Sequence, residues 1–101
     1  MCLALRAFGQ TADDWAALAT QGTEAYNRGA YAESEKFHRA GLAIAEKLGP
    51  KDDRLAASLS NLGTAYRAQG RYPEAEKLYR RALALREAIF GKDHPQVAPS
   101  W

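Results

Sequence analysis

The sequence predicts an all-α fold, a stack of antiparallel helical hairpins in two repeats. Three observations support this. Apolar residues recur at helical spacing in four segments, and glycine-containing turns separate these segments. The second half of the chain also repeats the first, with equivalent residues 41 positions apart, as Gly63 is from Gly22. A fixed period of this size is typical of stacked helical repeats.

The clearest hairpin lies between residues 54 and 91. We expect its first helix over 54–69, with one face formed by Leu59, Leu62, Gly63 and Tyr66. Gly70 suits a left-handed helix cap, and Pro73 suits the first turn of a second helix over 72–90. The apolar stripe of that second helix is Ala75, Leu78, Tyr79, Ala82, Leu85 and Ile89.

The first half is a copy of this hairpin, with helices expected over 15–28 and 31–48. After Gly49 the separation becomes 42, because Gly49 matches Gly91. Asp13 or Asp14 is expected to cap the first helix, and Asp52 or Asp53 the third. Small residues recur at the helix crossings, where they allow close packing: Gly22, Ser34 and Gly41 in one copy, and Gly63, Ala75 and Ala82 in the other.

The segment NLGTAYRAQGRYPEAEKLYRRALAL resembles a tetratricopeptide repeat. The long period and the GKDHPQVA linker are similar to the kinesin-light-chain type of that family. The resemblance covers residues 14–98 and implies a tetratricopeptide solenoid, that is, a right-handed superhelical stack of the two hairpins. The first repeat departs from the pattern, since Gln21 replaces a leucine and Tyr26 stands one place later than the expected tyrosine.

These matches divide the chain into four parts. Residues 13–50 form the first repeat, 51–92 the second, and 93–101 the truncated start of another. Residues 1–12 allow two interpretations, the remnant of a preceding helix or a leader. We favour the helix remnant and expect a cytoplasmic protein, whereas a clipped signal peptide would predict a periplasmic one.

Composition restricts the classes of partner. The 101 residues carry a net charge of +2, which is too small to indicate nucleic acid. No apolar run reaches 18 residues, so no membrane-spanning helix is expected. Cys2 is the single cysteine, which excludes a disulfide within the chain and a thiolate metal site.

The two histidines do not indicate catalysis. His38 follows Glu35 by three residues, but a carboxylate-bridged metal site needs a second such pair, and the other repeat has Tyr79 instead. His94 belongs to an Asp-His-Pro helix start. We therefore expect no catalytic residue, metal or cofactor, and no enzyme activity.

The sequence supports a binding surface better than a catalytic site. In stacked hairpins the first helices line a concave face. Short polar residues occupy this face where exposed helices usually carry Glu and Lys: Thr20, Thr23, Tyr26, Asn27, Ser60, Asn61, Thr64 and Arg67. The family resemblance implies a groove for a peptide segment of a partner protein, with Arg67 able to hold a carboxylate. The lysine and asparagine of the subclass that clamps a terminal carboxylate are absent, since Ala19 and Thr23 stand there.

The alternative function is self-assembly. No further repeat follows to cover Leu78, Leu85 and Ile89 on the last helix. An exposed apolar strip of this kind favours association. The alternative therefore predicts a structural unit, such as a homodimer or part of a longer array, that oligomerises through this helix.

Overall fold

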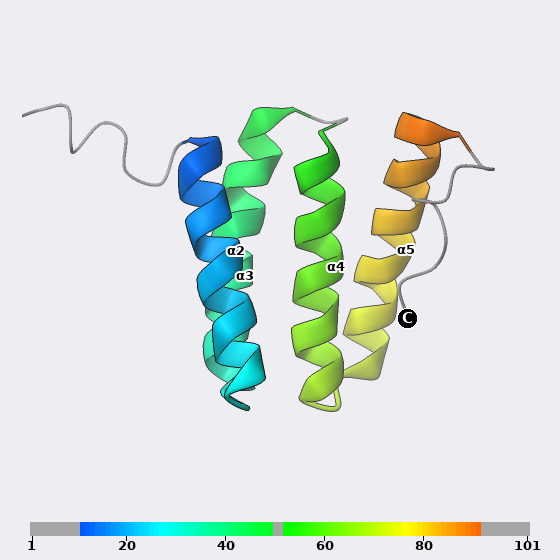
Figure 1. Ribbon diagram of the computed structural model, residues 1–101. Helices are drawn as coiled ribbons and strands as arrows, with labels where there is room; N and C mark the ends of the chain where they lie inside the picture. Colours follow the sequence, from blue (N-terminus) through cyan, green and yellow to red (C-terminus); the bar gives the residue numbers. More distant parts are fainter. Residues whose placement is uncertain (1–10, 50–51, 92–101) are drawn as a thin grey trace, which may run out of the picture.

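The computed structural model describes residues 11–49 and 52–91, which form four helices and no strand. These are α2 (Ala12–Asn27), α3 (Tyr31–Leu48), α4 (Asp53–Ala68) and α5 (Tyr72–Phe90). Neighbouring helices run antiparallel, and α4 lies between the α2–α3 hairpin and α5 (Figure 1). The predicted all-α stack of two helical hairpins is confirmed. The expectations for residues 1–10 and 92–101, including Cys2 and His94, lie outside the described residues.

The start of α2 differs from the prediction. The helix begins at Ala12, and its N-cap is Thr11 rather than Asp13 or Asp14. The Thr11 hydroxyl accepts a hydrogen bond from the Asp14 amide (3.2 Å), and the Asp14 carboxylate accepts one from the Thr11 amide (3.2 Å). This reciprocal pair is a capping box, which satisfies two amide groups that the helix itself leaves unpaired.

The start of α4, the start of α5 and the two hairpin turns lie where the sequence predicts them. Asp52 caps α4 by accepting a hydrogen bond from the Arg54 amide at 2.8 Å, and Pro73 lies in the first turn of α5. Both hairpin turns contain a glycine with a positive φ angle, +81° at Gly29 and +80° at Gly70. Only glycine adopts this conformation without strain, which fixes where each first helix ends.

The apolar core forms two clusters along α4. One contains Ala45, Leu55, Leu59 and Ala82. The other contains Leu62, Tyr66, Ala75 and Tyr79. Because α4 supplies residues to both clusters, it joins the two hairpins into one packed unit.

The small residues lie at the helix crossings, as predicted. Gly63, Ala75 and Ala82 are buried, and so are their counterparts Gly22, Ser34 and Gly41. A Cβ atom on Gly63 would lie 3.2 Å from Tyr79 and 3.3 Å from the Ala75 carbonyl oxygen. Larger residues would therefore separate α4 from α5.

Candidate peptide-binding groove

A polar hollow of about 190 Å³ lies between the two first helices. Thr23 and Tyr26 of α2 form one wall, and Asn61 and Thr64 of α4 form the other. All four residues were predicted to line the groove, and the structure brings them together. Their hydroxyl and amide groups can both donate and accept hydrogen bonds, as a peptide backbone requires of its partner.

His38 of α3 forms part of the hollow and was not predicted there. Its side chain is buried, with an exposed fraction of 6%. A Cβ atom on Gly22 would lie 2.5–2.8 Å from three atoms of the imidazole ring, so the ring rests directly on the backbone of α2. Burial lowers the pKa of His38 below its ordinary value of 6.5, because a buried imidazole pays a desolvation cost for its charge.

The neutral imidazole has one donor and one acceptor nitrogen. His38 thus packs between helices, and it also adds polar atoms to the groove. The sequence did contain a signal, because Gly22 faces His38 as Gly63 faces Tyr79 one repeat later. A glycine on the first helix thus marks where a ring from the second helix reaches the groove.

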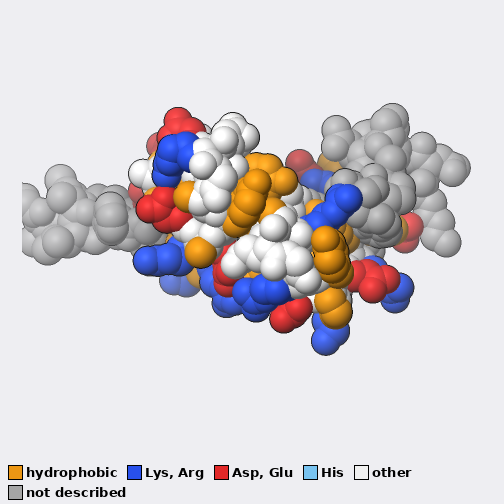
Figure 2. All heavy atoms as spheres, turned by 90° about the horizontal axis from the view of Figure 1, so that it is seen from below, with side chains coloured by type: hydrophobic (Ala, Val, Ile, Leu, Met, Phe, Trp, Pro, Cys, Tyr) orange, Lys and Arg blue, Asp and Glu red, His pale blue; other side chains and the backbone are white. Residues whose placement is uncertain are grey.

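A second hollow, of about 370 Å³, lies one repeat further along. Its lining includes Arg67, Tyr72, Ala75, Glu76 and Tyr79. The end of the molecule that carries the hairpin turns shows hydrophobic side chains between acidic and basic ones (Figure 2). Arg67 is exposed and makes no ion pair within residues 11–49 and 52–91. Its guanidinium is therefore available to a carboxylate of a ligand.

Thr64 connects the two hollows. Its hydroxyl donates to the Ser60 carbonyl oxygen (3.0 Å) and forms a hydrogen bond with the Tyr79 hydroxyl (2.8 Å). These contacts hold Thr64 and Tyr79 in fixed positions between the hollow that contains Asn61 and the one that contains Arg67. The two hollows therefore follow each other along one face of α4.

Three predicted groove residues lie elsewhere. Ser60 is buried, with an exposed fraction of 9%, and its hydroxyl lies 3.5 Å from a guanidinium nitrogen of Arg86. It faces α5 because its position on α4 turns it toward the partner helix. Thr20 and Asn27 are exposed but do not belong to the lining of either hollow.

The expected apolar strip on α5 is partly covered. Leu78 packs against both core clusters, and Leu85 against the first. Both side chains are half-buried, as is Ile89, and Tyr72 is the exposed large hydrophobic residue of the described chain. Leu78 and Leu85 thus contact the core of their own chain, since α5 turns its stripe toward α4, and the oligomer surface at Leu78, Leu85 and Ile89 stays a prediction. Leu85 does line an apolar hollow of about 460 Å³ beside α4.

Within 11–49 and 52–91, no three His, Cys, Asp or Glu side chains are grouped so that they could hold a metal ion. None of the four helices is both long enough and apolar enough to cross a membrane.

Comparison with known families shows that residues 55–96 match the model of the tetratricopeptide repeat. The match covers α4, α5 and the start of the following segment. These residues belong to the tetratricopeptide repeat family. The kinesin-light-chain type of repeat is consistent with this match. No curated protein matches the sequence.

Tetratricopeptide repeats generally mediate protein–protein interaction and form non-catalytic modules. The two hairpins present their first helices, α2 and α4, on the side that holds both hollows. The family and the geometry together indicate a surface for protein partners.

Proposed function

We propose that this protein is a non-enzymatic adaptor that binds an extended peptide segment of a partner along α2 and α4. The proposal is carried by the pair of adjacent hollows on that face. One offers uncharged hydrogen-bonding groups from Thr23, Asn61 and His38, and the next offers the exposed cation of Arg67. The first hollow fits a peptide backbone, and the second fits an acidic group of the same segment.

The open shape of the hollows supports a peptide rather than a small metabolite. Both are open surface depressions, and the aromatic rings of Tyr26 and Tyr79 stand at their edges. Tyr26 is held by an edge-to-face contact with Tyr31, with ring centroids 5.1 Å apart. Fixed aromatic walls beside backbone-binding groups provide contact area with little loss of side-chain entropy.

A displayed peptide library tests the proposal. The full chain should select a family of sequences with an acidic residue at a fixed position, and Arg67→Glu combined with Asn61→Ala should abolish their capture. Lys77→Glu is the matched control, because it reverses an exposed charge on α5 outside both hollows. Far-ultraviolet circular dichroism should show unchanged helicity in both variants. Equal capture by the double variant and the parent would refute the groove.

The assembly alternative has a separate test. If the protein instead functions as an oligomer through α5, sedimentation equilibrium should show a dimer that Ile89→Lys dissociates. Ile89 is the better site for this test than Leu85, because Leu85 packs against the core of its own chain. A monomer at high concentration would leave peptide binding as the supported function.

A further inference from the structure

The imidazole of His38 is an unpaired polar group in the hollow between α2 and α4. The residue is 6% exposed, and within residues 11–49 and 52–91 no hydrogen bond joins either ring nitrogen to another group. A Cβ atom on Gly22 would lie 2.5, 2.6 and 2.8 Å from the ring atoms Cε1, Nε2 and Nδ1. These distances are nearly equal, so a face of the ring, rather than an edge, covers Gly22. Because imidazole nitrogens bond in the plane of the ring, this contact leaves both of them unblocked.

The second repeat shows why the first has this space. Tyr79 is the counterpart of His38, 41 residues later, and it also covers a glycine of the first helix. Its hydroxyl bonds to the hydroxyl of Thr64 at 2.8 Å. Thr64 is the counterpart of Thr23, whose hydroxyl makes no hydrogen bond within the described part of the chain. The shorter imidazole therefore leaves room where the phenol of the second repeat fills it.

Asn61 and Thr23 supply the other unbonded groups of the hollow. Within the two described ranges neither side chain makes a hydrogen bond. The Thr64 hydroxyl, by contrast, already has two partners. No charged side chain of the described residues belongs to the lining. Because burial lowers the pKa of His38, its ring is neutral at pH 7, and the hollow offers donors and acceptors without charge.

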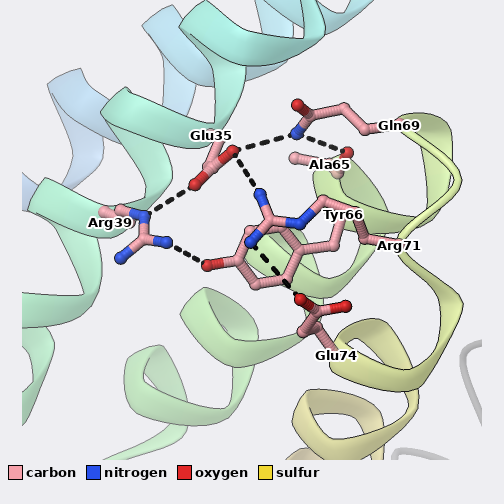
Figure 3. A network of polar contacts seen from close by, with 7 residues as sticks. All are labelled: Glu35, Arg39, Ala65, Tyr66, Gln69, Arg71 and Glu74. Atoms are coloured by element: carbon pink, nitrogen blue, oxygen red, sulfur yellow. Dashed lines mark hydrogen bonds and ion pairs between the residues drawn. The ribbon is translucent and has the colours of Figure 1, made fainter.

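A polar network ties α3 to α4 beside the hollow (Figure 3). Glu35 of α3 accepts hydrogen bonds from Gln69 (3.0 Å) and Arg71 (3.2 Å) in the α4–α5 turn. Arg39 of α3 bonds to Glu35 at 2.8 Å and donates to the hydroxyl of Tyr66 on α4. Both residues of α3 lie within one helical turn of the imidazole, so the network fixes the ring against the wall formed by α4. A ligand therefore meets a preformed site.

A primary carboxamide complements these groups. Its oxygen accepts and its NH₂ group donates, so it can pair with a nitrogen of the neutral imidazole and with the amide of Asn61 at once. A carboxylate only accepts and would lose hydration without gaining a cation, and an alkyl chain would leave the polar groups unpaired. The volume of about 190 Å³ is below the roughly 300–1,000 Å³ of pockets for whole small molecules, so the hollow fits a single side chain.

We propose that the hollow formed by His38, Asn61 and Thr23 selects the bound segment by the carboxamide of one glutamine or asparagine side chain. This selection rests on the proposed function, because the segment that lies along α2 and α4 carries the side chain into the hollow. It adds a second specificity position to the acidic residue expected at Arg67.

Peptides from the displayed library test this pairing. The selected sequences should carry glutamine or asparagine at a fixed distance from the acidic residue. A synthetic peptide with glutamine is then compared, by fluorescence anisotropy, with peptides that carry glutamate or methionine at that position. Methionine has nearly the length of glutamine without its amide. Both replacements should weaken binding by about 10-fold or more, because polar groups of the hollow lose their partner.

His38→Tyr is the matched variant, because it copies the second repeat. The phenol should cover Gly22 and bond to Thr23 as Tyr79 bonds to Thr64, which fills the hollow without disturbing the helix crossing. Circular dichroism should show unchanged helicity. The preference for the glutamine peptide over the methionine peptide should fall from about 10-fold to about 2-fold or less. Lys77→Glu, outside the hollow, should keep the full preference.

The outcomes separate this selection from the adaptor function. If acidic peptides are selected but glutamine and methionine bind equally, the hollow is only a hydrated depression, and peptide binding stands without the carboxamide. If the glutamate peptide binds most tightly, or if His38→Tyr keeps the full preference, the carboxamide assignment is overturned. If the library yields no binder, the adaptor function itself fails, and the selection fails with it.

Discussion

Ser34→Ala should stabilise the protein, although it removes a polar group from the interior. Ser34 is fully buried on α3, and its hydroxyl makes no hydrogen bond within the described part of the chain. Its counterpart in the second hairpin is Ala75, which is buried in the same crossing. Alanine therefore already fits this position in the repeat.

The size of the effect follows from two contributions. A buried hydroxyl without a partner costs about 1–3 kcal/mol relative to an apolar group, and alanine favours a helix interior over serine by roughly 0.5 kcal/mol. We expect Ser34→Ala to raise the free energy of unfolding by about 1–3 kcal/mol. For a chain of this size each kcal/mol raises the Tm by roughly 4–8 °C.

Ser58→Ala is the matched control, because Ser58 is buried but bonded. Its hydroxyl accepts a hydrogen bond from the indole nitrogen of Trp15 at 2.6 Å. Removing it leaves a buried donor unpaired, which should lower the free energy of unfolding by about 1–3 kcal/mol. Urea unfolding followed by circular dichroism measures both changes. If Ser34→Ala destabilises the protein as Ser58→Ala does, then the Ser34 hydroxyl has a partner and the reasoning fails.

Three further predictions concern the first hairpin and the cap of α4. Gly22→Ala places a Cβ 2.5 Å from the His38 ring and should lower the free energy of unfolding by about 1–3 kcal/mol. The Cβ of Gly41→Ala would lie 3.6 Å from its nearest neighbour, so this variant should raise the free energy of unfolding by roughly 0.5–1 kcal/mol. Thermal unfolding measures both changes. Because burial lowers the pKa of His38, stability should be full above pH 6.5 and fall as the pH drops below it, and His38→Gln should flatten this part of the pH profile. Asp52→Ala removes the cap of α4 and should cost about 1 kcal/mol at pH 7. Hydrogen bonds from Arg54 lower the pKa of Asp52 to about 2, so this contribution should disappear in urea titrations as the pH falls from 3.8 to about 2.

The sequence predicted the helices well because their signals are local. Pro73, Gly70 and Asp52 mark helix ends through their own backbone or side-chain chemistry, and the structure confirms each. The start of α2 was missed for a local reason too. Asp13 and Asp14 were predicted as caps, but Asp14 is the N3 residue of a capping box whose N-cap is Thr11. A threonine three residues before an acidic side chain was the signal.

The sequence predicted those groove residues that lie on the first helix of each hairpin. Thr23 and Tyr26 lie on one face of α2, and Asn61 and Thr64 lie on the corresponding face of α4. His38 comes from another helix and reaches the hollow because Gly22 admits it, so its place depends on packing between helices.

The network around Glu35 was also out of reach of the sequence pattern. Its partners Gln69 and Arg71 are 34 and 36 residues away, and only the stacking of the hairpins brings them close. Helical periodicity describes which residues share a face of one helix. It does not describe which turn of a later hairpin that face will meet.

The shift of one tyrosine places its ring on different faces of the two first helices. In the second hairpin Tyr66 points into the preceding α3, where Arg39 and Glu35 hold it and its turn. In the first hairpin the tyrosine stands one place later, and Tyr26 faces the groove and Tyr31 instead. Since successive positions on a helix are about 100° apart, this shift moves the ring from the stacking face to the concave face.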